Sequence, residues 1–277
     1  MTPVSRSSLA ELLAYPLAAL FGISSLVGVL RPDIAYRNET PLWTAQGVGQ
    51  DWVDLFVVVP LIVWSAARSR RGSRTARMVL GGALIYSLYS LVLYAFAVHF
   101  NPLFLIYCGG LGLSFYAVLD LVAATRVERT PGWFVERGPA KATGLFIALL
   151  GVAFYALWLS DVVPALLSAT TPKAIIDAGL ITNPVHVLDL SIVLPAFLVA
   201  GISLYRRRAL GYFLGPMLLA FGVIMDLALA GMAWSMAGRK IAGGGPPVAV
   251  FIGMAIVTAI VLWRFLRHMA GEERHTP

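Results

Sequence analysis

The chain has 277 residues, of which 59% are hydrophobic and only 13% are charged, whereas soluble domains carry about 25% charged residues. Together with a mean hydropathy of +0.81, this composition excludes a water-soluble globule and predicts a multi-pass membrane protein whose main partner is the lipid bilayer. The net charge of +7 is typical of membrane proteins with basic cytoplasmic loops, so no nucleic-acid partner is predicted.

Residue usage narrows the class further. The chain has one cysteine, Cys108, which excludes an intrachain disulfide and a cysteine-based zinc site. Eighteen of the 21 basic residues are arginine, a usage that we interpret as that of a GC-rich prokaryotic genome.

Eight uncharged runs of approximately membrane-spanning length follow one another along the chain. They cover residues 12–30, 55–67, 78–98, 102–119, 142–160, 190–205, 209–225 and 247–263. We therefore predict an all-α fold, a polytopic transmembrane helix bundle of eight spans that forms a single membrane domain over residues 1–277. The two longest outer connections, 31–50 and 161–183, are predicted to be loops.

The distribution of basic residues predicts the orientation. Placing both termini in the cytoplasm puts 16 of the 21 basic residues inside and leaves five outside, namely Arg31, Arg37, Lys173, Arg239 and Lys240. This asymmetry follows the positive-inside rule and predicts a plasma (inner) membrane protein with cytoplasmic termini. Because this sorting already explains the basic inner loops, we assign them no lipid or other ligand.

An internal repeat is suggested by two segments at an offset of 135 residues. Asp54-Leu-Phe-Val-Val-Val-Pro60 and Asp189-Leu-Ser-Ile-Val-Leu-Pro195 share the aspartate, the leucine, one valine and the proline. Four spans per half would point both halves the same way, with residues 1–135 and 136–277 as parallel repeats about an axis along the membrane normal. The alternative is a chance match between apolar segments.

The second and sixth runs are shorter than the roughly 20 residues that cross a bilayer. Both spans are therefore expected to draw in polar residues from their outer flanks, Asp51 and Asp54 in one case and His186 and Asp189 in the other. Each pair has a spacing of three residues, which places its members on one helix face. Because an ionisable group in a span costs roughly 2.5 to 3.5 kcal/mol, we expect all four to face inward, on one water-accessible cavity near the outer side.

Two prolines mark the second and sixth runs as candidates for a binding site. Pro60 and Pro195 each remove a backbone donor and free a carbonyl one turn earlier, inside a short span. Short, proline-interrupted segments at matching repeat positions are typical of transporter binding sites. The alternative is that these are ordinary kinked helices, in which Asp54 and Asp189 only cap helix dipoles.

Three further polar residues are candidates for substrate or ion binding. His99 and Asn101 lie in the outer turn between the third and fourth runs. With the aspartates they offer ligands of the kind that divalent cations accept, but no HxxxH or HExxH spacing exists, so no metal site is predicted and the cofactor stays unassigned. Asp226 is the deepest acid, either a functional group or a protonated structural aspartate.

The remaining polar groups of the spans are the hydroxyls of the third run and Asp120, and a hydrogen-bond or ion-pair partner is predicted for each. The hydroxyl stripe of Tyr86, Ser90 and Tyr94 on the third run is expected to hydrogen-bond Asp226 or to line a polar path. Asp120 is expected to form a salt bridge with the nearby arginines of the inner loop.

These observations leave three functional hypotheses. The leading one is a small-solute or ion permease, with or without proton coupling, in which Asp54 and Asp189 carry a proton or cation and His186 titrates beside them. The second is a membrane-embedded enzyme or metal-binding protein with an extracytoplasmic site. The third is a sensor or scaffold subunit that binds a protein partner through its outer loops. Enzymatic activity is therefore left undecided.

Overall fold

The structure is a computed structural model that describes residues 8–135, 139–241 and 248–269. This part of the chain contains eight helical segments that are long and apolar enough to cross a membrane. The single-helix spans are α1 (Leu9–Leu30), α5 (Arg74–Phe96), α6 (Phe104–Ala124), α7 (Ala140–Leu167), α11 (Ala209–Gly238) and α12 (Val248–Leu266). The predicted all-α bundle of eight spans is confirmed.

The second and sixth spans are each built from three consecutive helices. The second consists of α3 (Pro41–Val53), the π-helix η1 (Asp54–Val58) and α4 (Val59–Arg70). The sixth consists of α9 (Pro184–Leu188), the π-helix η4 (Asp189–Val193) and α10 (Leu194–Tyr205). Three short helices complete the described part of the chain: α2 (Pro32–Ala35), η2 (Val127–Trp133) and α8 (Lys173–Ala178).

The prediction that residues 31–50 and 161–183 are loops is wrong for most of their length. The second span begins at Pro41, because Thr40 caps it by accepting a hydrogen bond from the Trp43 N–H at 3.2 Å and the proline suits the first helical turn. In the second connection, α7 continues to Leu167 and α8 follows. Polar residues at these positions are compatible with a helix, although they lower its hydropathy.

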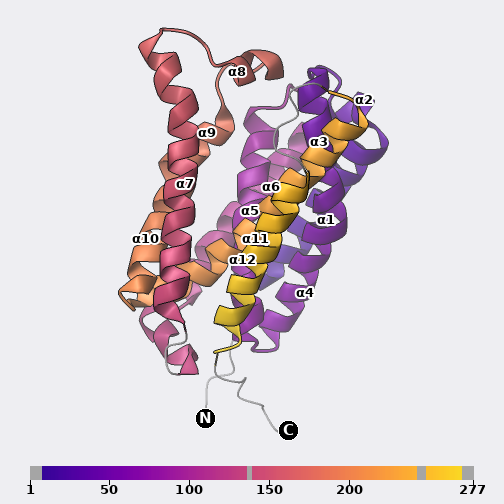
Figure 1. The fold of residues 1–277 in the computed structure, drawn as a ribbon. Helices are drawn as coiled ribbons and strands as arrows, with labels where there is room; N and C mark the ends of the chain where they lie inside the picture. The colour runs from indigo at the N-terminus through magenta and orange to yellow at the C-terminus, as the bar shows by residue number, and fades with distance from the viewer. Residues whose placement is uncertain (1–7, 136–138, 242–247, 270–277) are drawn as a thin grey trace.

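Helices α5 and α11 form the centre of the bundle. In the most apolar 18-residue stretch of each helix, 67% and 72% of the residues are buried. Their close approach depends on Gly82, where a Cβ atom would lie 2.5 Å from the Met217 carbonyl oxygen. Figure 1 shows α7, α9 and α10 on one side of this pair and α1 and α4 on the other.

Large apolar side chains cover the outside of the bundle. Leu105 on α6, Leu149 on α7 and Ile256 on α12 are 79%, 57% and 55% exposed. In a protein of this hydropathy, such a surface contacts the lipid chains.

The start of α1 and the end of α12 lie at the same end of the bundle (Figure 1). Both contact the first turn of α5, where Arg77 pairs with Glu11 and Thr75 donates a hydrogen bond to the sulfur of Met269. We refer to this as the terminal end, and to the end that holds α2 and α8 as the opposite end.

Candidate functional site

The second and sixth spans change locally from α- to π-helix, and both π segments begin at an aspartate. The Val59 N–H donates to the Asp54 carbonyl and the Leu194 N–H donates to the Asp189 carbonyl. In each span the next residue is a proline, which has no N–H to offer, so the helix accommodates one extra residue in the turn before it. Such π turns are frequent at functional sites.

Asp51 is buried among α1, α2 and α5, with 1% of the residue exposed. The hydroxyl of Tyr36 donates to Oδ2 at 2.5 Å and that of Tyr94 to Oδ1 at 2.9 Å. Burial, together with the adjacent Asp51 carboxyl, raises the pKa of Tyr36 well above its usual value, so this phenol stays a neutral donor. Gly28 makes room for the carboxyl, because a Cβ atom there would lie 1.8 Å from Oδ2.

Asp54 lies one helical turn further along the same span and is fully buried. The Tyr86 hydroxyl donates to Oδ1 at 2.7 Å, and the Gln50 amide donates to Oδ2 at 3.4 Å. The tyrosines of the hydroxyl stripe on α5 therefore bind Asp54 and Asp51 and not Asp226, which was the first of the two predicted roles. The second, lining a polar path, stays a prediction.

All hydrogen-bond donors to this pair of carboxyls are neutral. Among the described residues, no ion pair involves Asp51 or Asp54. Two further neutral hydroxyls, those of Ser25 and Ser90, are buried next to Asp51 and Tyr86. We call Asp51, Asp54 and the three tyrosines that bind them the aspartate–tyrosine site.

The second predicted pair, His186 and Asp189, contacts a different set of residues. Asp189 accepts a hydrogen bond from the indole N–H of Trp158 at 2.8 Å and a second one from the Tyr89 hydroxyl. His186 is buried, and its ring packs against that of Trp158 at a centroid distance of 4.5 Å. Asn183 caps the span by accepting from the His186 N–H at 3.2 Å.

Within each pair the two acidic or histidine side chains lie one helical turn apart on the same span. In the described part of the chain, no group of three or more histidine, cysteine, aspartate or glutamate side chains is placed to hold a metal ion. Helix α5 contacts both pairs, with Tyr86 on Asp54 and, about one helical turn further along, Tyr89 on Asp189. The single water-accessible cavity shared by all four side chains stays a prediction.

Asp226 is buried in the middle of α11, and it accepts a hydrogen bond from Thr258 of α12 at 3.3 Å. Asp120 caps the start of α1 by accepting from the Ala10 N–H at 2.8 Å. The predicted salt bridge of Asp120 with the inner-loop arginines is absent from the ion pairs of the described residues.

The two remaining candidates belong to the turn between α5 and α6. Asn101 is buried, donates to the Ala35 carbonyl at 2.9 Å and accepts from the Leu103 N–H at 2.8 Å, so its contacts hold the turn in place. The ring of His99 is half-exposed, and its Nδ1 lies 3.0 Å from Glu39. Neither residue contacts the aspartates through an interaction found among the described residues.

A comparison with known protein families, with curated proteins and with solved structures finds no match for this chain.

Proposed function

We propose that the protein is a membrane permease for a small cation, and that the aspartate–tyrosine site holds a proton or cation during transport. One observation carries the proposal: two carboxyls one helical turn apart are buried inside a spanning segment and bound only by neutral donors. A buried, unpaired ionisable group in a span is a functional-site hypothesis by default.

Charge balance supports this assignment. Burying one ionised carboxylate at the middle of a span costs roughly 2.5 to 3.5 kcal/mol on insertion scales, and a second negative charge beside it adds repulsion at low dielectric. Phenol and amide donors reduce the penalty but supply no positive charge. The pair therefore needs at least one proton or one bound cation.

The two π segments support a transport role as well as the predicted repeat. Asp54 and Asp189 occupy equivalent positions at the offset of 135 residues, and each begins a π turn. Transporters commonly place their ion sites at such irregular turns in repeat-related spans. The second pair, which α5 also contacts through Tyr89, is expected to serve as the partner site.

Contacts between equivalent residues support the parallel repeat of residues 1–135 and 136–277. At the same offset Gly82 corresponds to Met217 and Tyr86 to Phe221. These equivalents touch: Gly82 packs on the Met217 backbone, and the rings of Tyr86 and Phe221 have centroids 6.5 Å apart. Equivalent residues meet only near a symmetry axis, so the proposed axis runs between α5 and α11.

The first helix of each half departs from this symmetry. Helix α1 packs along α6, whereas its equivalent α7 packs mainly along α10 and touches α12 only slightly. Figure 1 shows α7 and α10 as a pair set beside the rest of the bundle. The proposed repeat is therefore closest around α5 and α11, next to the aspartates.

Transport is tested on the purified protein in liposomes that contain a trapped pH dye. Gradients of Na⁺, K⁺ and Mg²⁺ are imposed in turn, and we expect at least one of them to drive a proton flux in the wild type. Asp51→Asn and Asp54→Asn should abolish this flux, because they remove the charge and keep the shape. Asp177→Asn is the matched control, since Asp177 is exposed and pairs with Lys173 on α8.

Two outcomes of this experiment would contradict the proposal. A wild-type flux that both asparagine variants retain would remove the aspartates from the mechanism. The absence of proton or cation flux under all three gradients, in protein shown to be folded, would contradict the permease itself.

A further inference from the structure

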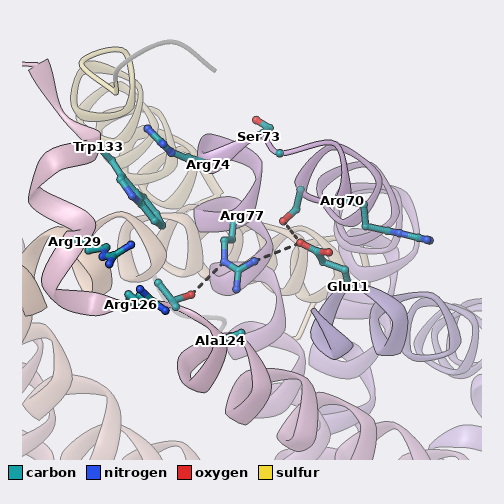
Figure 2. Close-up of a pocket in the computed structure, with 12 residues that line it drawn as sticks. Glu11, Arg70, Ser73, Arg74, Arg77, Ala124, Arg126, Arg129 and Trp133 are labelled. Carbon is teal, nitrogen blue, oxygen red and sulfur yellow. Dashed lines mark hydrogen bonds and ion pairs between the residues drawn. The ribbon is translucent and has the colours of Figure 1, made fainter. Parts of the chain in front are cut away.

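A second polar site lies at the terminal end of the bundle, where α4 ends and α5 begins. A pocket of about 320 Å³ opens there (Figure 2). Along the second span, Arg70 at the pocket is 19 residues from Asp51, roughly 28 Å at the rise of a helix. The pocket is therefore independent of the aspartate–tyrosine site.

Arginines dominate its lining. They come from three segments of the chain: Arg70 from α4, Arg74 and Arg77 from α5, and Arg126 and Arg129 from the connection after α6. Glu11 is the one acidic residue in the described lining. Positive-inside sorting explains why these residues lie on one side of the membrane, but it does not explain why they converge on one pocket.

Two of the residues that line the pocket, Arg77 and Glu11, are held in place by an ion pair and hydrogen bonds. The Arg77 side chain is 19% exposed, its Nε donates to Oγ1 of Thr125 at 3.1 Å, and its Nη1 lies 3.5 Å from Oε1 of Glu11. The same Glu11 oxygen accepts from the Ser69 hydroxyl at 2.5 Å. Glu11 is thus already engaged and does not neutralise the other arginines.

The other four arginines have no acidic partner among the ion pairs found in the described chain. Arg74 is positioned by Trp133, whose ring centroid lies 5.6 Å from its guanidinium carbon. Figure 2 shows Arg74, Arg126 and Arg129 grouped around Trp133 and Arg77, whereas Arg70 points away. Like charges held this close attract an anion from solution.

The backbone at the start of α5 adds to the positive charge of the pocket. Ser73 caps the 23-residue helix α5, and both Ser73 and Arg74 line the pocket. The first turn of a helix carries a partial positive charge, which favours an anion at this position.

We propose that this pocket binds a phosphate group, carried either by a soluble phosphate ester or by the headgroup of an anionic lipid. Guanidinium groups that approach from different segments match the several oxygens of a phosphate better than a single carboxylate. The volume is at the lower end for ligand pockets and suits a phosphate with a small substituent.

The soluble arm of the test uses the full-length protein in a non-ionic detergent, titrated with pyrophosphate while thermal unfolding is followed. Chloride at matched ionic strength is the salt control. We expect saturable stabilisation of the wild type, and an apparent affinity at least roughly tenfold weaker in Arg126→Gln/Arg129→Gln. Both side chains are exposed and form no ion pair with the residues that the structure describes, so this double variant should fold normally.

The lipid arm uses native mass spectrometry after purification from membranes doped with phosphatidylglycerol or phosphatidylcholine. Preferential retention of phosphatidylglycerol by the wild type, lost in the double variant, assigns the site to a headgroup. Stabilisation by pyrophosphate without lipid retention assigns it to a soluble ester.

The matched control is Arg206→Gln/Arg208→Gln, which removes two exposed arginines at the same end of the bundle but outside the pocket. It should bind as the wild type does. The proposal is overturned if both double variants lose binding equally, if chloride stabilises as well as pyrophosphate, or if neither arm detects binding. Asp51→Asn should leave phosphate binding intact, which separates this site from the proposed transport function.

Discussion

The contact between α1 and Asp51 allows the geometry of the aspartate–tyrosine site to be tested by a single methyl group. In Gly28→Ala, the new Cβ would lie 1.8 Å from Oδ2 and 2.6 Å from Cγ of Asp51. Both distances are far inside van der Waals contact, so the carboxyl must move. The movement also pulls Oδ2 away from the Tyr36 hydroxyl, which now donates to it at 2.5 Å.

The expected loss of stability combines two effects. Overpacking a core position costs about 1 to 3 kcal/mol, and a broken hydrogen bond to a buried polar group costs about 1 to 3 kcal/mol. The alanine itself favours the helix by about 0.5 to 1 kcal/mol. We therefore expect Gly28→Ala to lower the free energy of unfolding by roughly 1 to 5 kcal/mol.

The assay is denaturant unfolding of the purified protein in detergent, followed by circular dichroism. Gly112→Ala is the control, because a Cβ at Gly112 meets nothing within 4 Å, and it should be neutral or slightly stabilising. Adding Asp51→Ala to Gly28→Ala removes the clash, so a double-mutant cycle should show coupling above about 1 kcal/mol. A Gly28→Ala protein as stable as Gly112→Ala would refute the packing of Asp51 against α1.

Three further outcomes are expected. Asp54→Asn should unfold at nearly the wild-type denaturant concentration while losing proton flux, because it deletes a charge and keeps the volume; a large loss of stability would indicate a purely structural carboxylate. Tyr86→Phe should lower the free energy of unfolding by about 1 to 3 kcal/mol, whereas Tyr116→Phe, at a residue 62% exposed, should have no effect, and equal effects would dismiss the hydrogen bond to Asp54. With Cys108 replaced by serine, an impermeant thiol reagent added to intact cells should label Thr170→Cys but not Glu128→Cys; the reverse pattern would invert the predicted orientation.

The sequence predicted the spans and the burial of the carboxyls because both follow from the membrane itself. Apolar runs of sufficient length must become helices, and short runs must take in flanking polar residues. Asp51 and Asp54 are accordingly buried inside the second span. The prolines at positions 60 and 195 also indicated irregular turns, although not that these would be π turns.

The partners of the carboxyls could not be predicted, because they depend on how each helix is rotated. Helix α5 is apolar nearly all round and largely buried, so its sequence pattern does not say which face its tyrosines present to which neighbour. Tyr36 was missed because it lay in a predicted loop, and Trp158 because a tryptophan near a span end is typical of an interfacial anchor. Gly28 carried no signal beyond its small size.

The arginine pocket could not be predicted from the sequence either. Charge counting predicted that its arginines lie on one side of the membrane, but only the packing of α4, α5 and η2 brings Arg74, Arg77 and Arg129 around one volume. Convergence of these segments is a property of the tertiary structure, and it is independent of the rule that sorts basic residues across the membrane.

The account depends most directly on the claim that the two buried carboxyls hold a proton or a cation. Infrared difference spectroscopy of the carboxyl stretch tests it on the protein in lipid, at neutral pH, in a buffer whose only cations are bulky organic ions. Because no small cation is then present, we expect a band from a protonated carboxylic acid that Asp51→Asn or Asp54→Asn shifts or removes and Asp177→Asn leaves unchanged. A spectrum in which Asp51 and Asp54 contribute only carboxylate bands would contradict the account.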